Sequence, residues 1–263
     1  AVRIVLLGLV VLHLLVLYEV ASNNPDGIEI KKNKDENGIP LDGISFPPYY
    51  SVHDLVPIVV FIFIFCFILF FMPEMGGYFI EHANFEIANQ LKTPEHIAPV
   101  WYFTPYYSML RAVPDKFLGF LVMAAAVAIL FVLPWLDRSP VKSIRYKGNA
   151  SRVAVVLFAA VFIILGILGM KAPTPARTAL AQVCTVIYFL YFLAMPIWTK
   201  LEKTKPEPVR VTMDGGMGFW RALGVLFIVI GLVIVPLKAV GASVSYNHLN
   251  LPTKKGDERA GGA

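Results

Sequence analysis

The sequence has little charge and little cysteine. Only 16% of its 263 residues are Asp, Glu, Lys or Arg, while 57% are hydrophobic, and a soluble domain usually has about 25% charged residues. The two cysteines, Cys66 and Cys184, both lie inside apolar runs, so they predict small buried side chains and argue against a disulfide framework or a zinc site. The net charge of +5 arises in loops between apolar runs and does not indicate binding to nucleic acid.

The chain also lacks the features of a secretory signal ahead of its first apolar run. It starts at Ala1 without an initiator Met, a charged leading region or a small-residue cleavage site. We therefore interpret the first run as a membrane helix that a chain break or a processing event has cut.

Long apolar runs are what the sequence has instead. A helix needs about 20 apolar residues to cross a hydrocarbon core of ~30 Å. The apolar runs predict an all-α fold, which is an integral membrane helical bundle with about six transmembrane helices. Two long functional loops, Ala21–His53 and Pro73–Lys116, connect some of these helices. The runs are Val2–Tyr18, Leu55–Met72, Phe117–Trp135, Val153–Met170, Leu180–Trp198 and Phe219–Leu237.

Basic residues in the short loops predict how the chain is oriented. The loop Asp137–Arg152 is the most basic short connection, and positive charge favours the cytoplasmic or matrix side. The loops Ala21–His53 and Thr199–Gly218 would share that side. The loop Pro73–Lys116, the tight reversal Lys171–Thr178 and the C-terminal tail would face the opposite side. Two elaborate loops on opposite faces indicate two sites rather than one.

His13 is an ionisable residue inside the first apolar run. Such a residue is costly at membrane depth and indicates function by default, and a neutral imidazole is a good axial ligand for haem iron. The alternative is a histidine that packs between helices and bonds a neighbouring carbonyl. His13 by itself leaves both interpretations open.

Three ordered stretches follow. They are Glu19–Gly27, Phe46–Asp54 and Pro99–Pro114, the last of which begins Pro-Val-Trp-Tyr-Phe. Together they resemble cytochrome b of a bacterial-type ubiquinol–cytochrome c oxidoreductase, from the fourth transmembrane helix of that family onward. The resemblance covers roughly residues 4–200, and the run Phe219–Leu237 lies beyond the usual end of the family.

The resemblance implies that His13 is an axial ligand of the higher-potential haem b. A complete member of the family holds two b haems, and its other ligands would lie outside this chain. It also implies a quinone-reduction pocket formed by Tyr18, Ser22, Phe46, His53 and Asp54. There Asp54 would deliver a proton to the quinone. The alternative for Asp54 is a helix N-cap, and Tyr18 replaces a histidine that many members use to bind the quinone.

The third stretch resembles the Pro-Glu-Trp-Tyr loop of the quinol-oxidation pocket. Its aromatic side chains suit a flat quinone ring. Val100 stands where the family usually has a glutamate that accepts a quinol proton, so water, Tyr107 or a carboxylate outside this chain would have to take it. The alternative is an interfacial aromatic belt, which does not explain an ordered string. The implied pocket residues are Pro99, Val100, Trp101, Tyr102, Phe103 and Tyr107.

The resemblance therefore implies an enzyme subunit that oxidises quinol at one membrane face and reduces quinone at the other. The cofactors would be haem b and ubiquinone or ubiquinol. The partners would be the remaining N-terminal part of cytochrome b, a Rieske iron–sulfur protein, a cytochrome c1-type subunit, lipid, a second copy of the complex and a terminal oxidase. The location would be a bacterial inner membrane rather than a mitochondrial one.

Other functions fit the sequence less well. A non-catalytic anchor or assembly subunit would need none of the three stretches, and a transporter would need polar or broken helices at the midplane of the membrane. The split cytochrome b of photosynthetic complexes breaks after the histidine-bearing helix, whereas this chain starts inside that helix.

The predicted organisation has five parts along the chain. They are the end of a haem-binding transmembrane helix (1–20), a cytoplasmic-side loop at the quinone-reduction site (21–53), transmembrane helices flanking the quinol-oxidation loop 73–116 (54–136), two C-terminal transmembrane helices (137–200), and a linker, an extra transmembrane helix and a polar tail (201–263).

Overall fold

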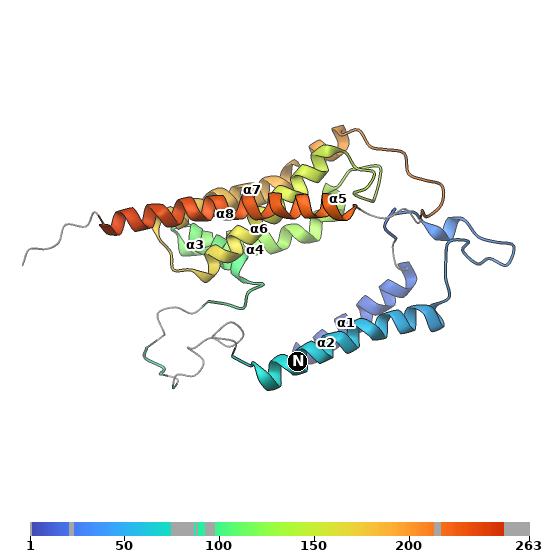
Figure 1. Ribbon diagram of the computed structural model, residues 1–263, viewed down its shortest axis with the longest axis horizontal. Coiled ribbons are helices and arrows are strands. Elements are labelled where there is room, and N and C mark those ends of the chain that lie inside the picture. Colours follow the sequence, from blue (N-terminus) through green and yellow to red (C-terminus); the bar gives the residue numbers. More distant parts are fainter. Residues whose placement is uncertain are drawn as a thin grey trace, which may run out of the picture. The chain divides into compact units, whose positions relative to one another are not determined.

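The structure is a computed structural model of the chain, and it describes residues 2–20, 24–74, 87, 89–92, 98–212 and 217–249. Within these ranges the chain is helical and has no β-strand, only one isolated bridge between Lys34 and Pro40. It divides into two compact units (Figure 1). Unit 1 comprises Ala1–Ile97, Val141–Tyr146 and Thr204–Asp214, and unit 2 comprises Ala98–Pro140, Lys147–Lys203 and Gly215–Ala263.

Five helical segments are long and apolar enough to cross a membrane. They are Phe46–Phe71, Lys116–Leu136, Asn149–Met170, Pro175–Leu201 and Phe219–Gly241. The remaining predicted run, Val2–Tyr18, is also helical, but its apolar stretch, Val2–Leu17, is shorter. The expectation of an all-α membrane bundle is therefore confirmed. The five-part organisation follows the course of the chain rather than its compact units, and it stays a prediction.

Unit 1 contains two long helices and the loops that follow them. Helix α1 (Val2–Val20) is followed by the short 3-10 helix η1 (Ile30–Lys32). A single π-type turn, η2 (Phe46–Tyr50), leads directly into α2 (Ser51–Phe71). No residue of α2 is buried within the chain. Because the helix is apolar from Leu55 to Phe71, this exposure is what a lipid-facing or subunit-facing span requires.

Unit 2 is a packed helical bundle. Its elements are α3 (Thr104–Ala112), α4 (Lys116–Ala128), η5 (Ile129–Val132), α5 (Leu133–Leu136), α6 (Asn149–Met170), α7 (Pro175–Leu201) and α8 (Phe219–Leu249). Helix α6 packs on α3, α7 and α8, and α3 also packs on α4 and α7. The core is centred on Tyr188, Phe192 and Leu165, which are fully or almost fully buried. The short helix α3 lies at the end of the bundle where α6 runs into α7 (Figure 1).

Local chemistry sets the helix ends in unit 2. Asp115 caps α4 by accepting a hydrogen bond from the amide of Leu118 at 2.7 Å. The N-terminus of α6 is capped from a distance, because the Glu202 carboxylate accepts from the amide and the hydroxyl of Ser151 at 3.1 and 2.6 Å. Such caps satisfy amide groups that have no partner within their own helix.

The start of α7 differs from the predicted one. The sequence predicts a reversal over Lys171–Thr178, but α7 already begins at Pro175. Thr174 accepts a hydrogen bond from the amide of Arg177 at 3.3 Å and acts as the N-cap. Proline is favoured at the first helical position because its fixed φ suits a helix and its missing N–H would have no partner there. Pro175 thus starts the helix rather than extending the turn.

Candidate functional site

The predicted quinol-oxidation stretch forms a tight turn that enters α3. The amide of Phe103 donates to the carbonyl of Val100 at 2.8 Å, and the hydroxyl of Thr104 donates to the carbonyl of Trp101 at 2.6 Å. Within this turn the Trp101 and Tyr102 rings pack edge to face, with their ring centres 5.6 Å apart. The ring centres of Tyr102 and Phe103 are 5.0 Å apart. The turn therefore gathers the aromatic side chains of the motif into one cluster.

This aromatic cluster is open. The side chains of Val100, Trp101, Tyr102 and Phe103 are all more than half exposed, and Pro99 is partly buried. Tyr107 lies one helical turn beyond Phe103, and its amide donates to the Phe103 carbonyl at 2.9 Å. The sequence-predicted pocket residues thus lie next to one another at the N-terminal end of α3, where the exposed rings of Trp101, Tyr102 and Phe103 can contact a flat ligand.

Helix α3 is held close against the end of α6. An alanine Cβ at Gly169 would overlap the backbone of Thr104, because the carbonyl carbon of Thr104 lies 2.7 Å from that position. On the other side, the Gln182 side chain of α7 donates to the carbonyl of Ala112 at 2.9 Å. These contacts hold both ends of α3 against α6 and α7, so the aromatic turn precedes a helix whose position in the bundle is fixed.

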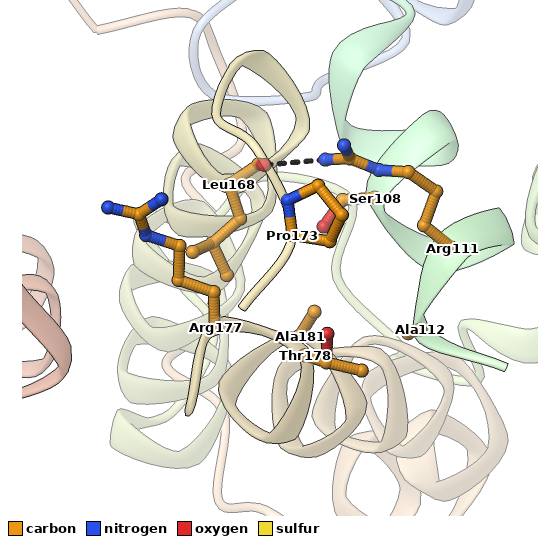
Figure 2. A pocket seen from close by; sticks show the side chains of 8 residues that line it. All are labelled: Ser108, Arg111, Ala112, Leu168, Pro173, Arg177, Thr178 and Ala181. Atoms are coloured by element: carbon orange, nitrogen blue, oxygen red, sulfur yellow. Dashed lines mark hydrogen bonds between the residues drawn. The ribbon is translucent and has the colours of Figure 1, made fainter. Parts of the chain in front are cut away.

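A small cavity lies beside the C-terminal half of α3 (Figure 2). Its volume of about 10 Å³ is roughly the room of one water molecule. It is therefore far too small for a quinone ring, and it is distinct from the aromatic cluster. Its lining residues are Ser108, Arg111, Ala112, Leu168, Pro173, Arg177, Thr178 and Ala181.

The predicted quinone-reduction residues around Phe46 also lie together. The Phe46 and Tyr50 rings stack at 6.2 Å, and the His53 ring meets the edge of Tyr50 at 6.3 Å. His53 Nδ1 lies 3.9 Å from Asp54 Oδ1, and both side chains are mostly exposed. Tyr18 lies near the end of α1; its side chain and Ser22 are outside the described residues.

The alternative interpretation of Asp54 as an N-cap is wrong. The N-cap position of α2 belongs to Tyr50, and Asp54 lies inside the first turn of the helix. A carboxylate there still interacts favourably with the positive end of the helix dipole. Its exposed oxygens are free of any capping hydrogen bond, which leaves them open to a ligand or to water.

His13 lies in α1 with an exposed side chain among exposed leucines. No group of three or more His, Cys, Asp or Glu side chains comes together within the described ranges, but an axial haem ligand is a single imidazole. A lone imidazole on an apolar helix face fits one side of a haem. It cannot by itself supply the ligand for the other side.

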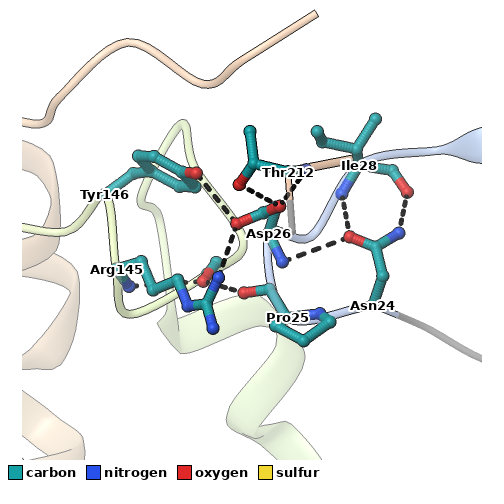
Figure 3. A network of polar contacts seen from close by, with 8 residues as sticks. Asn24, Pro25, Asp26, Ile28, Arg145, Tyr146 and Thr212 are labelled. Carbon is teal, nitrogen blue, oxygen red and sulfur yellow. Dashed lines mark hydrogen bonds and ion pairs between the residues drawn. The ribbon is translucent and has the colours of Figure 1, made fainter. Parts of the chain in front are cut away.

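Asp26 organises the loops of unit 1 (Figure 3). Its carboxylate is fully buried. Oδ1 accepts from Arg145 at 3.0 Å and from the hydroxyl of Tyr146 at 2.9 Å, while Oδ2 accepts from the amide and the hydroxyl of Thr212 at 2.9 and 3.0 Å. One carboxylate thus joins segments that are more than 100 residues apart in the chain.

Further polar contacts join the same loops, which we call the loop cluster of unit 1. The hydroxyl of Ser143 donates to the carbonyl of Pro25 at 2.6 Å, and the guanidinium of Arg210 donates to Asp42 at 2.7 and 3.0 Å. Gly27 has a positive φ of 74° and approaches Lys142 so closely that a Cβ would lie 2.9 Å from the Cβ of that lysine. A glycine is therefore required at this turn on two counts.

The hydrogen bonds fix the ionisation of these groups. The pKa of Asp26 is lowered to about 2, chiefly by the amide of Thr212 and then by Tyr146, the Thr212 hydroxyl and Arg145. The Arg210 guanidinium holds the pKa of the Asp42 carboxyl below its usual value. Burial, together with the bond to Asp26, raises the pKa of the Tyr146 hydroxyl. Asp26 and Asp42 are thus charged at neutral pH, as their cationic partners require.

The contacts of this cluster concern three loops that the sequence predicts on one side of the membrane, while the identity of that side stays a prediction. The loops that Asp26 joins are the ones around residues 24–45, 141–146 and 204–212. These are the same three connections that their basic residues assign to one side of the membrane. Because loops on opposite sides cannot touch across a bilayer, their direct contact supports placing them on one side.

The sequence by itself assigns no role to Asp26, Gly169 or Arg111. Asp26 was part of a recognised stretch, but nothing in the sequence marks Thr212 or Tyr146 as its partners. Gly169 looked like an ordinary glycine of an apolar run. Arg111 is the one charged residue of the third stretch, Pro99–Pro114, and that charge is the only local signal that distinguishes it.

Comparison with known proteins yields one consistent family. Residues 87–189 match the family described as cytochrome b (C-terminal)/b6/petD. The chain is 55% identical to the cytochrome b of Allochromatium vinosum over 215 residues, which cover 79% of this chain and 52% of that protein. It is 42% identical to the cytochrome b of Rhodospirillum rubrum over 208 residues, 79% of this chain and 49% of that protein.

A solved structure agrees with these relatives. A chain of a hyperthermophilic respiratory Complex III matches with a TM-score of 0.67 and 36% sequence identity, over 76% of this chain and 48% of that one. The chain thus spans about half the length of the relatives that it matches. Its apolar helices and its similarity to these cytochromes b make it an integral membrane protein.

Proposed function

The chain carries the C-terminal region of cytochrome b, and on that premise we propose that it forms this region in the cytochrome b subunit of a quinol:cytochrome c oxidoreductase. Quinol is oxidised at the aromatic turn before α3, and quinone is reduced near the start of α2. Electron transfer through b haems links the two sites and is coupled to proton translocation.

The observation that carries this proposal is the aromatic turn on its anchored helix. Trp101 and Phe103 each contact Tyr102, and all three side chains remain exposed. They precede a short helix that is fixed at both ends. A flat quinol ring needs apolar ring faces that are already in place. A turn that only anchored the chain at the membrane interface would not need a close-packed glycine contact behind it.

Proton transfer at this site needs a group other than Val100. Oxidation of a quinol releases two electrons and two protons, and an isopropyl side chain accepts neither. Tyr107 lies one turn along α3 from Phe103, and its hydroxyl can accept a hydrogen bond from a quinol hydroxyl while donating to water. In our proposal, Tyr107 therefore positions the quinol and passes its proton to water.

On the other side, Asp54 and His53 handle protons for quinone reduction. Both side chains are exposed and lie within 3.9 Å of each other, beside the stacked rings of Phe46 and Tyr50. A carboxylic acid can donate to a quinone oxygen as charge develops on it, and a neighbouring imidazole can reprotonate the acid. Tyr18 and Ser22 complete this pocket in the proposal.

His13 would hold a haem b by its imidazole. The bound haem supplies one-electron transfer between the two quinone sites, and α1 holds the ligand in an apolar surrounding that excludes water. The remaining N-terminal part of cytochrome b would supply the other ligands. The partners are a Rieske iron–sulfur protein, a cytochrome c1-type subunit, lipid, a second copy of the complex and a terminal oxidase, in a bacterial inner membrane.

Replacing His13 tests the proposal in the assembled complex. His13→Leu keeps the helix apolar but removes the axial ligand, so we expect the higher-potential b-haem signal to disappear from the reduced spectrum. Quinol-dependent reduction of cytochrome c should then fall by at least about a hundredfold. Leu12→Ala, an exposed neighbour on α1, should leave both unchanged. An unaltered b-haem spectrum in His13→Leu would rule out the assignment.

A further inference from the structure

Arg111 binds the end of α6 rather than solvent. Its Nη2 donates to the carbonyls of Leu168, Gly169 and Lys171 at 2.7, 3.2 and 3.1 Å. The last carbonyls of a helix have no partner within it and carry the negative end of the helix dipole. A guanidinium there satisfies these groups and is held in a fixed place by them.

The same guanidinium lies over the ring of Tyr107. Its Cζ is 4.5 Å from the centre of the ring, within the range of a cation–π interaction. Tyr107 is four residues before Arg111, so the two side chains lie on the same face of α3. Arg111 therefore contacts the end of α6 with one part of its guanidinium and the face of Tyr107 with another.

This double contact restricts the Tyr107 ring. The guanidinium is planar and cannot leave the ring without breaking its bonds to the carbonyls. Its Nε is buried and donates to no acceptor among the described residues, so the Nη2 bonds alone set its orientation. The small cavity beside Ser108 and Arg111 (Figure 2) has room for no more than about one water molecule.

A neighbouring arginine does not share this role. Arg177 lines the same cavity but donates to the carbonyl of Ala172 at 2.9 Å, inside its own loop. It carries the same charge at the same end of the bundle, and no ring contact links it to Tyr107. Figure 2 shows the two guanidinium groups at separate places. Arg177 is therefore a matched control for the charge of Arg111.

We propose that Arg111 is a positioning residue that fixes the Tyr107 ring, and so its hydroxyl, for contact with quinol. The inference rests on the proposed function of the aromatic turn. It adds that Arg111 connects Tyr107 to the end of α6. Because Val100 provides no carboxylate, the proposed quinol contact depends on how the Tyr107 hydroxyl is aligned.

A double-mutant cycle in the purified complex tests this proposal. Arg111→Lys keeps the positive charge, but an ammonium cannot hold three carbonyls and also lie flat on a ring. We expect kcat for quinol oxidation, measured per b haem, to fall by about tenfold, with a smaller change in KM and an altered pH profile. In a Tyr107→Leu background the same Arg111→Lys change should have almost no further effect.

The outcomes separate the inference from the proposed function. If wild-type complex does not oxidise quinol, or Tyr107→Leu leaves the rate unchanged, the proposed site is wrong. If Tyr107→Leu slows the reaction but Arg111→Lys behaves like the control Arg177→Lys, or the two changes add, the positioning role is wrong. Arg111→Gln, whose planar amide can still donate to a carbonyl, should retain more activity than Arg111→Leu. Failure of every Arg111 variant to assemble, while Arg177→Lys assembles, would assign Arg111 to folding and overturn the proposal.

Discussion

At the scale of single residues, Asp26 shows what one buried carboxylate can hold together. It is fully buried, and each of its oxygens accepts more than one hydrogen bond. A buried charge is costly unless it is paired and hydrogen-bonded. Removing the charge would leave the guanidinium of Arg145 facing a neutral group. Asp26 should therefore contribute to the stability of the loop cluster in proportion to its ionisation.

The prediction for Asp26 is a pH-dependent loss of stability. Because its pKa is about 2 in the folded chain and about 3.9 in an unfolded one, its contribution is complete above about pH 4 and is lost as the pH falls towards about 2. Asp26→Asn should lower the melting temperature by several degrees at neutral pH, and the difference from wild type should shrink below about pH 4.

Thermal melting of the detergent-solubilised complex across this pH range measures the effect. Glu36→Gln, which alters an exposed carboxylate of the same loop, serves as the control and should melt like wild type. A constant difference between Asp26→Asn and wild type at all pH values would mean that the ionised carboxylate is not the stabilising form.

At the scale of elements, the contact between α3 and α6 decides where the aromatic turn lies. The contact depends on a glycine in the last turn of α6, where the backbone of Thr104 approaches. Gly166, one turn earlier, is different, because a Cβ there would meet Pro105 and Thr104 at 3.6 Å, an ordinary distance. The two glycines therefore offer a matched pair of substitutions on one helix face.

We expect Gly169→Ala to push α3 away from α6. The added methyl group would overlap the Thr104 backbone, and overpacking of this kind costs about 1–3 kcal/mol. Quinol oxidation should slow by about tenfold or more while the b-haem spectrum is retained. Gly166→Ala should affect neither property. Equal behaviour of the two variants in rate and melting assays would contradict the proposed close contact.

At the scale of the whole molecule, the proposed function separates two half-reactions on opposite membrane faces. In the proposal, Asp54 acts at one face and the aromatic turn at the other. A substitution at one site should therefore act on its own half-reaction first. The exposed Asp54 carboxylate has no capping role to lose.

Asp54→Asn should slow the re-oxidation of reduced b haem by quinone, by about tenfold or more, because the amide cannot donate an acidic proton. Quinol oxidation, followed separately with the quinone-reduction site inhibited, should stay within about twofold of wild type. Flash or stopped-flow spectroscopy of the b haem resolves the two steps, with Glu36→Gln as control. If quinol oxidation is slowed as much as haem re-oxidation, Asp54 does not act at a separate site.

The sequence by itself determined the membrane architecture. Apolar runs near 20 residues long must form helices in a bilayer, since no other open structure satisfies the backbone groups there. It also brought together the residues of the aromatic turn, because Pro99–Phe103 and Tyr107 are neighbours in the chain.

Tertiary structure decided which remote groups meet. Asp26 finds its partners 119 to 186 residues away, and Arg111 finds the end of α6 57 to 60 residues away. Nothing in a local pattern selects such pairs, because they depend on how helix ends and loops converge after the spans have packed. The sequence thus determined the spans and the aromatic string, and packing alone decided that α6 would hold the arginine beside Tyr107.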